Sequence, residues 1–251
     1  MSPRASCVLC PNASAMTLEG TNTWVLSEPG SSAAIVLDPG PLDEGHLQAV
    51  LGHVADTGRR VALTLLTHGH DDHAGSADRF AQLSAAPVRA FGRGHDDVRP
   101  GETIRVGGLE ILAVHTPGHT SDSFSFVLPA DNMLLTGDTI LGRGTTVVAW
   151  PDGNLEDYLE SLDRLERLTR AGTVTSILPG HGPFVPDAAA TVTYYLGHRA
   201  ERLDQVRAAI TGGTTTAREV VELVYADVPR ELWPAAELSV EAQLAYLRTH
   251  S

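Results

Sequence analysis

The segment Thr67-His68-Gly69-His70-Asp71-Asp72-His73 groups three histidines and two aspartates within a few positions. It follows the apolar run Val61-Ala62-Leu63-Thr64-Leu65-Leu66, whose length and composition predict a buried strand. Imidazole and carboxylate are the usual ligands of zinc and its first-row neighbours. The first two histidines would share one direction from an extended backbone, whereas Asp72 and His73 require a turn or a first helical turn. The segment therefore predicts ligands for two adjacent metal positions. So many histidines and aspartates in so few residues disfavour an ordinary polar loop.

Three further predicted strands end in a histidine or an aspartate set among glycines. Polar residues at the ends of several strands of one sheet tend to line a shared crevice, and glycine and proline let the backbone turn sharply there. Each loop alone would pass for a turn, but four such loops together strongly indicate one site. The three loops are His115-Thr116-Pro117-Gly118-His119-Thr120, Gly137-Asp138-Thr139 and Pro179-Gly180-His181-Gly182.

The order of predicted elements indicates an α/β sandwich followed by an α-helical appendage. Asp43, Asn154 and Thr216 are predicted helix N-caps, and Gly107-Gly108 predicts a tight hairpin. Strands are expected at about 23–26, 33–37, 61–66, 88–91, 103–106, 109–114, 123–128, 133–136 and 173–178. Helices are expected at about 44–56, 74–83, from 155 onward, 187–210, 216–225 and 235–249.

Composition limits the partners of the chain. Its 251 residues carry a formal charge of -13 with no lysine, which argues against broad, charge-driven nucleic-acid binding but permits a local basic groove. No apolar run reaches the roughly 18 residues of a membrane span, and the N-terminus does not read as a secretory signal. We therefore expect a cytoplasmic protein without a membrane partner. The lone pair Cys7 and Cys10 is expected to be two reduced thiols rather than a zinc or redox site.

The pattern His68-x-His70-x-Asp72-His73, followed by His119, Asp138 and His181, resembles the metallo-β-lactamase fold superfamily over roughly residues 8–185. The resemblance implies a four-layer αβ/βα sandwich with metals held by loops between the two sheets. Residues 1–185 would form the catalytic domain, and residues 186–251 a helical, partly winged-helix-like domain without a clear wing hairpin. Two divalent metal ions are implied, zinc first and iron or manganese as alternatives.

The resemblance also implies a role for each ligand. His68, His70 and His119 would hold one ion, Asp72, His73 and His181 the other, and Asp138 would bridge them. Such a pair holds a bridging hydroxide, and Asp72 and Asp138 would be the catalytic carboxylates. Asp38 and Asp71 are candidates for orienting the histidines. The antibiotic-hydrolysing branch has no histidine like His73, so β-lactamase activity is disfavoured.

Three motifs look like the branch called β-lactamase-like protein 2, which implies cleavage of phosphodiester bonds in single-stranded RNA. They are residues 20–24, 137–146 and 179–183. The segment from Asp138 to His181 is too short for the inserted cap of the processing nucleases. Residues 115–120 are shared with hydroxyacylglutathione hydrolases, so a thioesterase or other acyl hydrolase acting on a small ester or thioester is the alternative. A mono-iron oxygenase, and a binding protein with an idle metal site, also stay open, as does a homodimer.

Candidate substrate contacts lie outside the ligand set. Asn22, Thr145 and Thr146 could donate hydrogen bonds to a substrate oxygen, although bonding within their own loops is an equal alternative. His198 lies on the predicted long helix beside Arg199 and Arg202 and could face the metal cleft. A solvent-exposed helix position is the alternative for His198.

Overall fold

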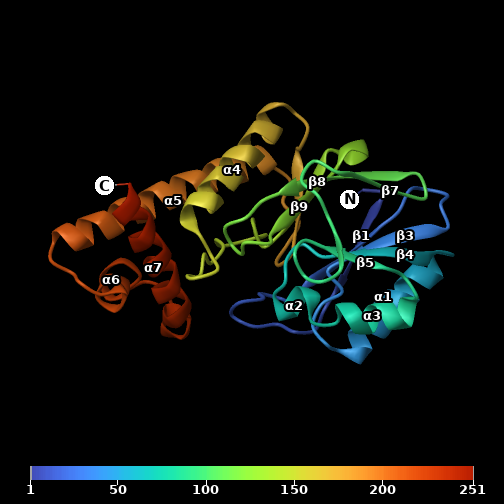
Figure 1. The fold of residues 1–251 in the computed structure, drawn as a ribbon, viewed down its shortest axis with the longest axis horizontal. Helices are drawn as coiled ribbons and strands as arrows, with labels where there is room; N and C mark the ends of the chain where they lie inside the picture. The colour runs from blue at the N-terminus through green and yellow to red at the C-terminus, as the bar shows by residue number, and fades with distance from the viewer. Residues whose placement is uncertain (1, 251) are drawn as a thin grey trace.

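The computed structural model describes residues 2–250 and arranges them as two β-sheets, flanked by helices, with a helical tail on one side (Figure 1). The strand order is β1-β2-β3-β4-β5-β6 in the first sheet and β11-β10-β9-β8-β7 in the second. The first sheet consists of β1 (Ala5–Leu9), β2 (Asn22–Leu26), β3 (Ala33–Leu37), β4 (Arg60–Leu65), β5 (Val88–Ala90) and β6 (Asp96–Asp97). The second consists of β7 (Thr103–Val106), β8 (Leu109–His115), β9 (Phe124–Leu128), β10 (Met133–Gly137) and β11 (Ser176–Pro179).

Successive side chains of a strand point to opposite faces of its sheet, so each sheet packs against the other sheet on one face and against helices on the other. In β3, Ile35 and Leu37 point into the core between the two sheets, whereas Ala34 and Val36 pack against helices on the outer face. The second sheet is covered on its outer face in the same way. The predicted four-layer sandwich is confirmed. The outer helices are α1 (Glu44–Asp56) and α3 (Ala77–Ser84) on the first sheet, and α4 (Leu155–Arg170) and α5 (Ala188–Thr211) on the second.

The C-terminal tail has a separate apolar core. It is formed by the second half of α5 together with α6 (Ala217–Val224) and α7 (Trp233–Thr249), around Val206, Val221, Trp233 and Val240. The first half of α5 instead packs on the second sheet through Val192 and Tyr195. Within residues 186–250 the tail contains no strand, in agreement with a winged-helix-like region that has no wing hairpin. Two short 3₁₀ helices are η1 (Pro129–Asp131), between β9 and β10, and η2 (Arg230–Leu232), before α7.

The direction of the strands brings the ligand loops together. Because β9 is antiparallel to both β8 and β10, and β11 is parallel to β10, the C-terminal ends of β8, β10 and β11 lie at one edge of the second sheet. In the first sheet, β4 runs parallel to both of its neighbours. The loops that follow β4, β8, β10 and β11 therefore converge between the sheets.

Local differences from the predicted elements have long-range causes. The helix expected to begin at Ala74 begins at Ala77, because Ser76 bonds to the Gly40 carbonyl and the chain turns there. The first helical turn that Asp72 and His73 were expected to need is α2 (Asp71–Ala74). Cys7 and Cys10 are both free thiols, as predicted. Among residues 2–250, no helix has the length and apolarity required to span a membrane.

Candidate metal centre

The seven predicted ligands come from four loops and meet at one place. The loop after β4 supplies two histidines and leads into α2, while the loops after β8, β10 and β11 supply one residue each. Three groups of side chains have ligand atoms within 4.8 Å of one another, and every predicted ligand belongs to at least one group. The groups are His68, His70 and His119; His68, His73 and Asp138; and Asp72, His73 and His181.

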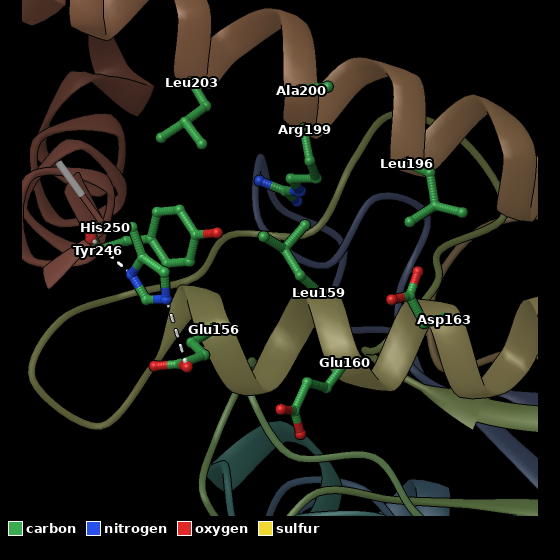
Figure 2. A pocket seen from close by; sticks show the side chains of 10 residues that line it. All are labelled: Glu156, Leu159, Glu160, Asp163, Leu196, Arg199, Ala200, Leu203, Tyr246 and His250. Atoms are coloured by element: carbon green, nitrogen blue, oxygen red, sulfur yellow. Dashed lines mark hydrogen bonds and ion pairs between the residues drawn. The ribbon is translucent and has the colours of Figure 1, made fainter.

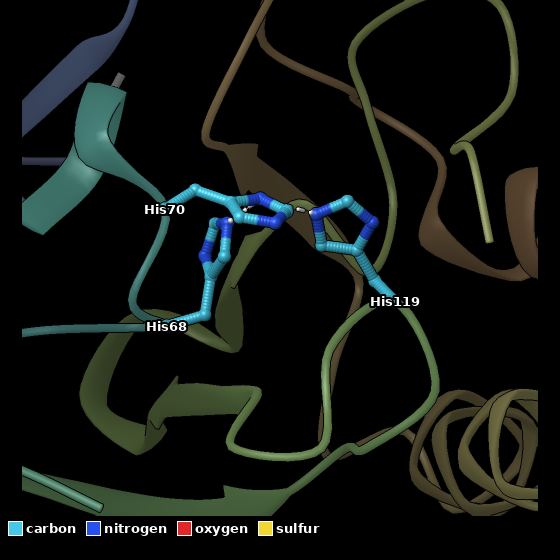
Figure 3. Close-up of side chains that lie close together, drawn as sticks. All are labelled: His68, His70 and His119. Atoms are coloured by element: carbon cyan, nitrogen blue, oxygen red, sulfur yellow. Dashed lines mark hydrogen bonds between the residues drawn. The ribbon is translucent and has the colours of Figure 1, made fainter. Parts of the chain in front are cut away.

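The first group is a triad of imidazoles (Figure 3). His70 Nδ1 lies 3.0 Å from His68 Nε2 and 3.1 Å from His119 Nε2. His68 and His119 are buried, whereas His70 is exposed. The cluster therefore opens to solvent on the side of His70.

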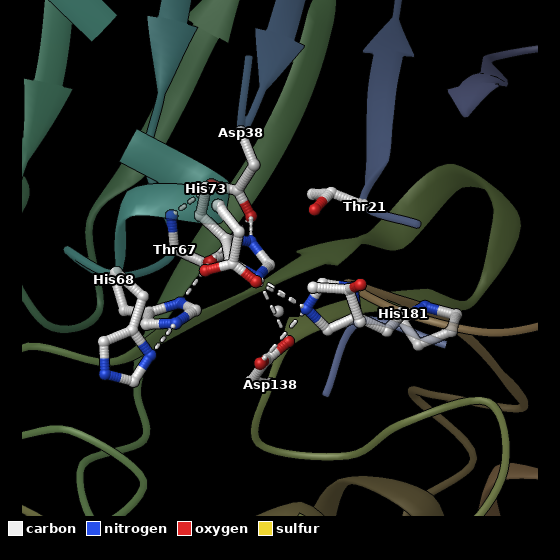
Figure 4. A network of polar contacts seen from close by, with 12 residues as sticks. Thr21, Asp38, Thr67, His68, His73, Asp138 and His181 are labelled. Atoms are coloured by element: carbon white, nitrogen blue, oxygen red, sulfur yellow. Dashed lines mark hydrogen bonds and ion pairs between the residues drawn. The ribbon is translucent and has the colours of Figure 1, made fainter. Parts of the chain in front are cut away.

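The group of Asp72, His73 and His181 lies deeper, since both of its histidines are almost completely buried; Figure 4 shows these two rings beside Asp138. His181 Nε2 is 3.1 Å from both His73 Nε2 and Asp72 Oδ2. Asp138 lies between the groups: one carboxylate oxygen is 3.3 Å from His73 Nε2, and the other is 3.8 Å from His119 Nε2. This is the position that a ligand bridging two cations would need.

In four of the imidazole rings, Nδ1 faces away from the cluster and contacts an oxygen atom. Three of these oxygen atoms can only accept a hydrogen bond: His73 Nδ1 is 2.9 Å from Asp38 Oδ2, His119 Nδ1 is 2.7 Å from the Val147 carbonyl, and His181 Nδ1 is 3.1 Å from the Gly20 carbonyl. The fourth, Thr67 Oγ1, is 3.0 Å from His68 Nδ1. A carboxylate or carbonyl acceptor requires the proton on Nδ1, which leaves the Nε2 lone pair facing the cluster.

The cluster fits a cation. With their Nδ1 protons engaged, His73 and His181 bring their Nε2 atoms to 3.1 Å from each other, a separation that requires a positive charge between the two lone pairs, either a proton or a metal cation. Asp138 Oδ1 is buried and, although it lies 3.3 Å from His73 Nε2, it makes no hydrogen bond of normal geometry among the described residues, which is unusual for a carboxylate that is not coordinated. Imidazole and carboxylate together suit zinc, iron or manganese.

The Asp38 carboxylate connects the loop after β4 with His73. This buried carboxylate accepts hydrogen bonds from the Thr67 backbone N–H and hydroxyl, each at 2.7 Å, in addition to the contact with His73. The Asp38 backbone has φ 53°, a left-handed conformation that turns the chain at the end of β3. The structure thus gives Asp38 the orienting contact expected of it. Asp71, the other candidate, is exposed and contacts none of the imidazole nitrogens among the described residues.

In the metal-free cluster, burial and the nearby carboxylates shift the pKa values of four histidines in two directions. Burial, together with His73, holds the pKa of His68 well below its usual value, and burial also lowers the pKa of His119. Burial opposes protonation of His73 too, but the Asp138 and Asp38 carboxylates outweigh it and raise that pKa well above its usual value. Against the same burial, Asp138 and Asp72 raise the pKa of His181 to about 9. The deeper group is therefore built to hold positive charge.

The predicted substrate contacts are mostly engaged within the protein. The Asn22 amide donates to the Pro179 and Gly182 carbonyls at 3.0 and 2.9 Å, and so shapes the His181 loop. The Thr146 hydroxyl is buried and donates to the Asp138 carbonyl at 2.7 Å. Thr145 is half-buried, and no described hydrogen bond involves its side chain.

His198 is half-buried on α5, and its ring lies 6.0 Å from that of Tyr194. No hydrogen bond or ring contact among the described residues joins His198 to the metal-ligand cluster. Burial, with Arg199 and Arg202 nearby, lowers its pKa to about 4.

Several supporting groups were not predicted from the sequence. The carbonyls of Gly20 and Val147 orient two ligands, but a backbone group leaves no sequence signal. Thr67 precedes His68 directly, and its hydroxyl could have been proposed from that position. The Arg93 guanidinium covers Gly69, where an added Cβ would lie 1.9 Å from Arg93 Cζ, and Arg93 Nε donates to Asp122 at 2.5 Å.

Comparison with protein families gives two matches. Residues 16–181 match the metallo-beta-lactamase superfamily, and residues 216–249 match the beta-lactamase associated winged helix domain. The first match covers all seven proposed ligands, and the second covers α6 and α7.

Two kinds of curated relative have similar identity. A beta-lactamase-like protein 2 homolog from Drosophila melanogaster is 31% identical over 262 residues, covering 96% of this chain and 86% of the relative. An atrochrysone carboxyl ACP thioesterase from Aspergillus chevalieri is 31% identical over 249 residues, covering 92% of this chain and 76% of the relative.

Solved structures share the fold, and one of them covers nearly the whole chain. A metallo-beta-lactamase family protein from Thermus thermophilus superimposes with a TM-score of 0.83 at 22% identity, covering 99% of this chain and 94% of that one. ETHE1 from Myxococcus xanthus gives a TM-score of 0.65 at 23% identity and covers 95% of this chain and 98% of that one.

Proposed function

The chain belongs to the metallo-β-lactamase superfamily, and we propose on that premise that it is a hydrolase with two divalent metal ions, zinc first among the candidates. The observation that carries the proposal is the pair of imidazole Nε2 atoms, of His73 and His181, that face each other at 3.1 Å while their Nδ1 atoms contact oxygen acceptors. In this proposal His68, His70 and His119 hold one ion, Asp72, His73 and His181 hold the other, and Asp138 bridges them.

The carboxylates of the cluster and the groups that orient its histidines have separate roles in the proposed reaction. Two divalent ions held by these residues would make water a nucleophile near neutral pH and would stabilise the developing oxyanion. Asp138 fixes the separation of the two ligand groups. Asp72, whose side chain is 29% exposed, lies at the edge of the deeper group and accepts the proton of the attacking water. Asp38 and the Gly20 and Val147 carbonyls keep the ligand nitrogens aimed inward.

The first proposed substrate is the phosphodiester bond of single-stranded RNA. The motifs at residues 20–24, 137–146 and 179–183 support it, as do relatives named beta-lactamase-like protein 2 homolog that align over 96% of the chain. The exposed face of His70 gives a bulky strand a side from which to approach the cluster.

A thioester is the second candidate, and two observations favour it. Relatives named atrochrysone carboxyl ACP thioesterase are as similar in sequence as the first kind. The formal charge of -13 also opposes the approach of a polyanion such as RNA more than that of a small thioester. The same proposed dinuclear core would serve either reaction, because both pass through an oxyanion.

The decisive experiment combines metal analysis with two substrates. Protein purified without added metal should contain two equivalents of a divalent ion and, when fully loaded, should cleave an oligoribonucleotide. His70→Ala should abolish cleavage, whereas His53→Ala, a histidine on α1 that bonds Ser6 outside the cluster, should not. Intact RNA together with hydrolysed acyl thioester would replace the first substrate by the second. A single iron would favour the oxygenase, and equal activity of wild type and His70→Ala would reject the proposed centre.

A further inference from the structure

Arg199 is a buried guanidinium that lacks an ion pair. It lies on α5 in the groove between α4, α5 and α7, with 8% of its surface exposed (Figure 2). None of the ion pairs within residues 2–250 includes it, although Glu160 and Asp163 line the same groove, and its Nε atom is buried without a hydrogen-bond partner. A buried charge without a counter-charge destabilises a fold. Its presence therefore calls for a role other than stability.

The contacts of Arg199 point to the loop between β10 and α4. One guanidinium nitrogen donates to the Thr146 carbonyl, and the guanidinium lies 4.8 Å above the Tyr158 ring. Tyr158 in turn donates its hydroxyl proton to the Thr139 carbonyl at 2.6 Å. Arg199 and Tyr158 together thus hold the two ends of the segment that follows Asp138.

That segment touches the proposed metal centre twice. The Thr146 hydroxyl donates to the Asp138 carbonyl at 2.7 Å. The carbonyl of the next residue, Val147, is 2.7 Å from His119 Nδ1 and is the acceptor that fixes this ring. Arg199 therefore bonds the residue directly before Val147, whose carbonyl determines which nitrogen His119 presents to the cluster.

We infer that Arg199 is a positioning residue for the metal centre: it holds residues 146–147 so that the Val147 carbonyl keeps the proton of His119 on Nδ1. The inference rests on the proposed metal centre. It also gives α5 two roles: the helix contributes to the apolar core of the tail and, through Arg199, orients the metal ligand His119. A purely structural Arg199 would have no effect on metal affinity beyond its effect on stability.

The test compares two arginines of the same helix. Arg199→Met keeps a long apolar side chain, and Arg202→Met is the control, because Arg202 donates to Val224 and stacks 4.6 Å above Tyr225 within the tail. Zinc affinity is measured by competition with a chelating dye, the His119 tautomer by ¹⁵N NMR of the metal-free protein, and stability by thermal unfolding. For Arg199→Met we expect a loss of zinc affinity of about 10- to 100-fold and a mixture of His119 tautomers, with a Tm no lower than that of Arg202→Met.

Unchanged zinc affinity and a single His119 tautomer in Arg199→Met would overturn the inference. If that variant does not fold, Arg199→Lys and Arg199→Gln replace it. The lysine can still donate to the Thr146 carbonyl, so we expect it to retain most of the affinity that the shorter, neutral glutamine loses, and equal affinities would reject the inference. Wild-type protein that binds no divalent metal ion would instead reject the proposed function, and the tautomer measurement would still test Arg199.

Discussion

Gly69 separates two proposed ligands, and the Arg93 guanidinium occupies the space that any side chain at this position would need. An added Cβ would lie 1.9 Å from Arg93 Cζ, and Arg93 is anchored by its 2.5 Å contact with the buried Asp122. For Gly69→Ala we therefore expect either Arg93 or the His68–His70 turn to shift. Because the contact is with the end of an exposed, flexible side chain, the free energy of unfolding should fall by less than about 1 kcal/mol, measured by urea unfolding. Zinc affinity, measured by dye competition, should fall several-fold if Arg93 holds the turn.

The matched control is Gly52→Ala in the middle of α1, where no atom lies within 4 Å of the added Cβ. There the substitution should raise the free energy of unfolding by about 0.5–1 kcal/mol and leave zinc affinity unchanged. Wild-type affinity in Gly69→Ala would mean that Arg93 does not hold the turn.

His198 should make stability depend on pH. Burial first, and then Arg199 and Arg202, lower its pKa to about 4, with Glu201 opposing them. The native state thus binds fewer protons than the unfolded chain between about pH 6.5 and 4, so this contribution is present above pH 6.5 and is lost as the pH falls toward 4. Wild type should lose more stability over this range than His198→Gln in urea unfolding. Parallel curves for the two proteins would contradict the lowered pKa.

At the scale of helices and strands, local signals predicted what local contacts stabilise. Asp43, Asn154 and Thr216 were expected as N-caps, and each accepts a hydrogen bond from the backbone N–H three residues on. The start of α3 was wrong by three residues, because the turn before it is held by bonds between Ser76 and the distant Gly40. The two-residue strand β6 is exposed and acidic, so it has no apolar pattern from which to be predicted.

The residues of the candidate site likewise fall into those that the sequence predicted and those that depend on distant contacts. Histidines and aspartates in strand-end loops could be listed from the sequence, and the structure brings all seven together. Among the groups that orient them, Asp38 was predicted, but the Gly20 and Val147 carbonyls could not be, because a backbone group leaves no sequence signal. Arg93 was missed as well, because it reaches Gly69 from another loop.

The capping box of α6 offers a test of how separate the tail is. Thr216 and Glu219 each bond the backbone N–H of the other at the start of this eight-residue helix. Thr216→Ala should lower the free energy of unfolding by about 1 kcal/mol and leave zinc affinity unchanged, because α6 belongs to the tail core. Thr193→Ala, at an exposed position within α5, should instead stabilise by a few tenths of a kcal/mol. Weaker zinc binding in Thr216→Ala would mean that the tail core itself supports the metal centre.

At the scale of the molecule, α5 is the main connection between two apolar cores, and Ala242 of α7 also packs into the core on the second sheet. The first half of α5 packs on the second sheet and its second half organises the tail. Trp150 adds a further link between them, since its backbone N–H donates to the Leu238 carbonyl of α7 at 3.3 Å. The loop that carries Thr146 and Val147 is therefore held from both α5 and α7, which places the tail in contact with the walls of the proposed active site.

The net charge provides the last test, because it acts differently on the two proposed substrates. With a formal charge of -13, the protein repels RNA at long range, and salt screens that repulsion over a Debye length that falls from about 20 Å at 20 mM to about 7 Å at 200 mM. If RNA is the substrate and no basic groove collects it, kcat/KM for an oligoribonucleotide should rise several-fold over this salt range, whereas kcat/KM for an uncharged acyl thioester should stay constant. Binding through a basic surface has the opposite slope, because salt weakens phosphate contacts. A kcat/KM for RNA that falls with salt would therefore reveal a local basic groove and remove the charge-based argument for the thioester.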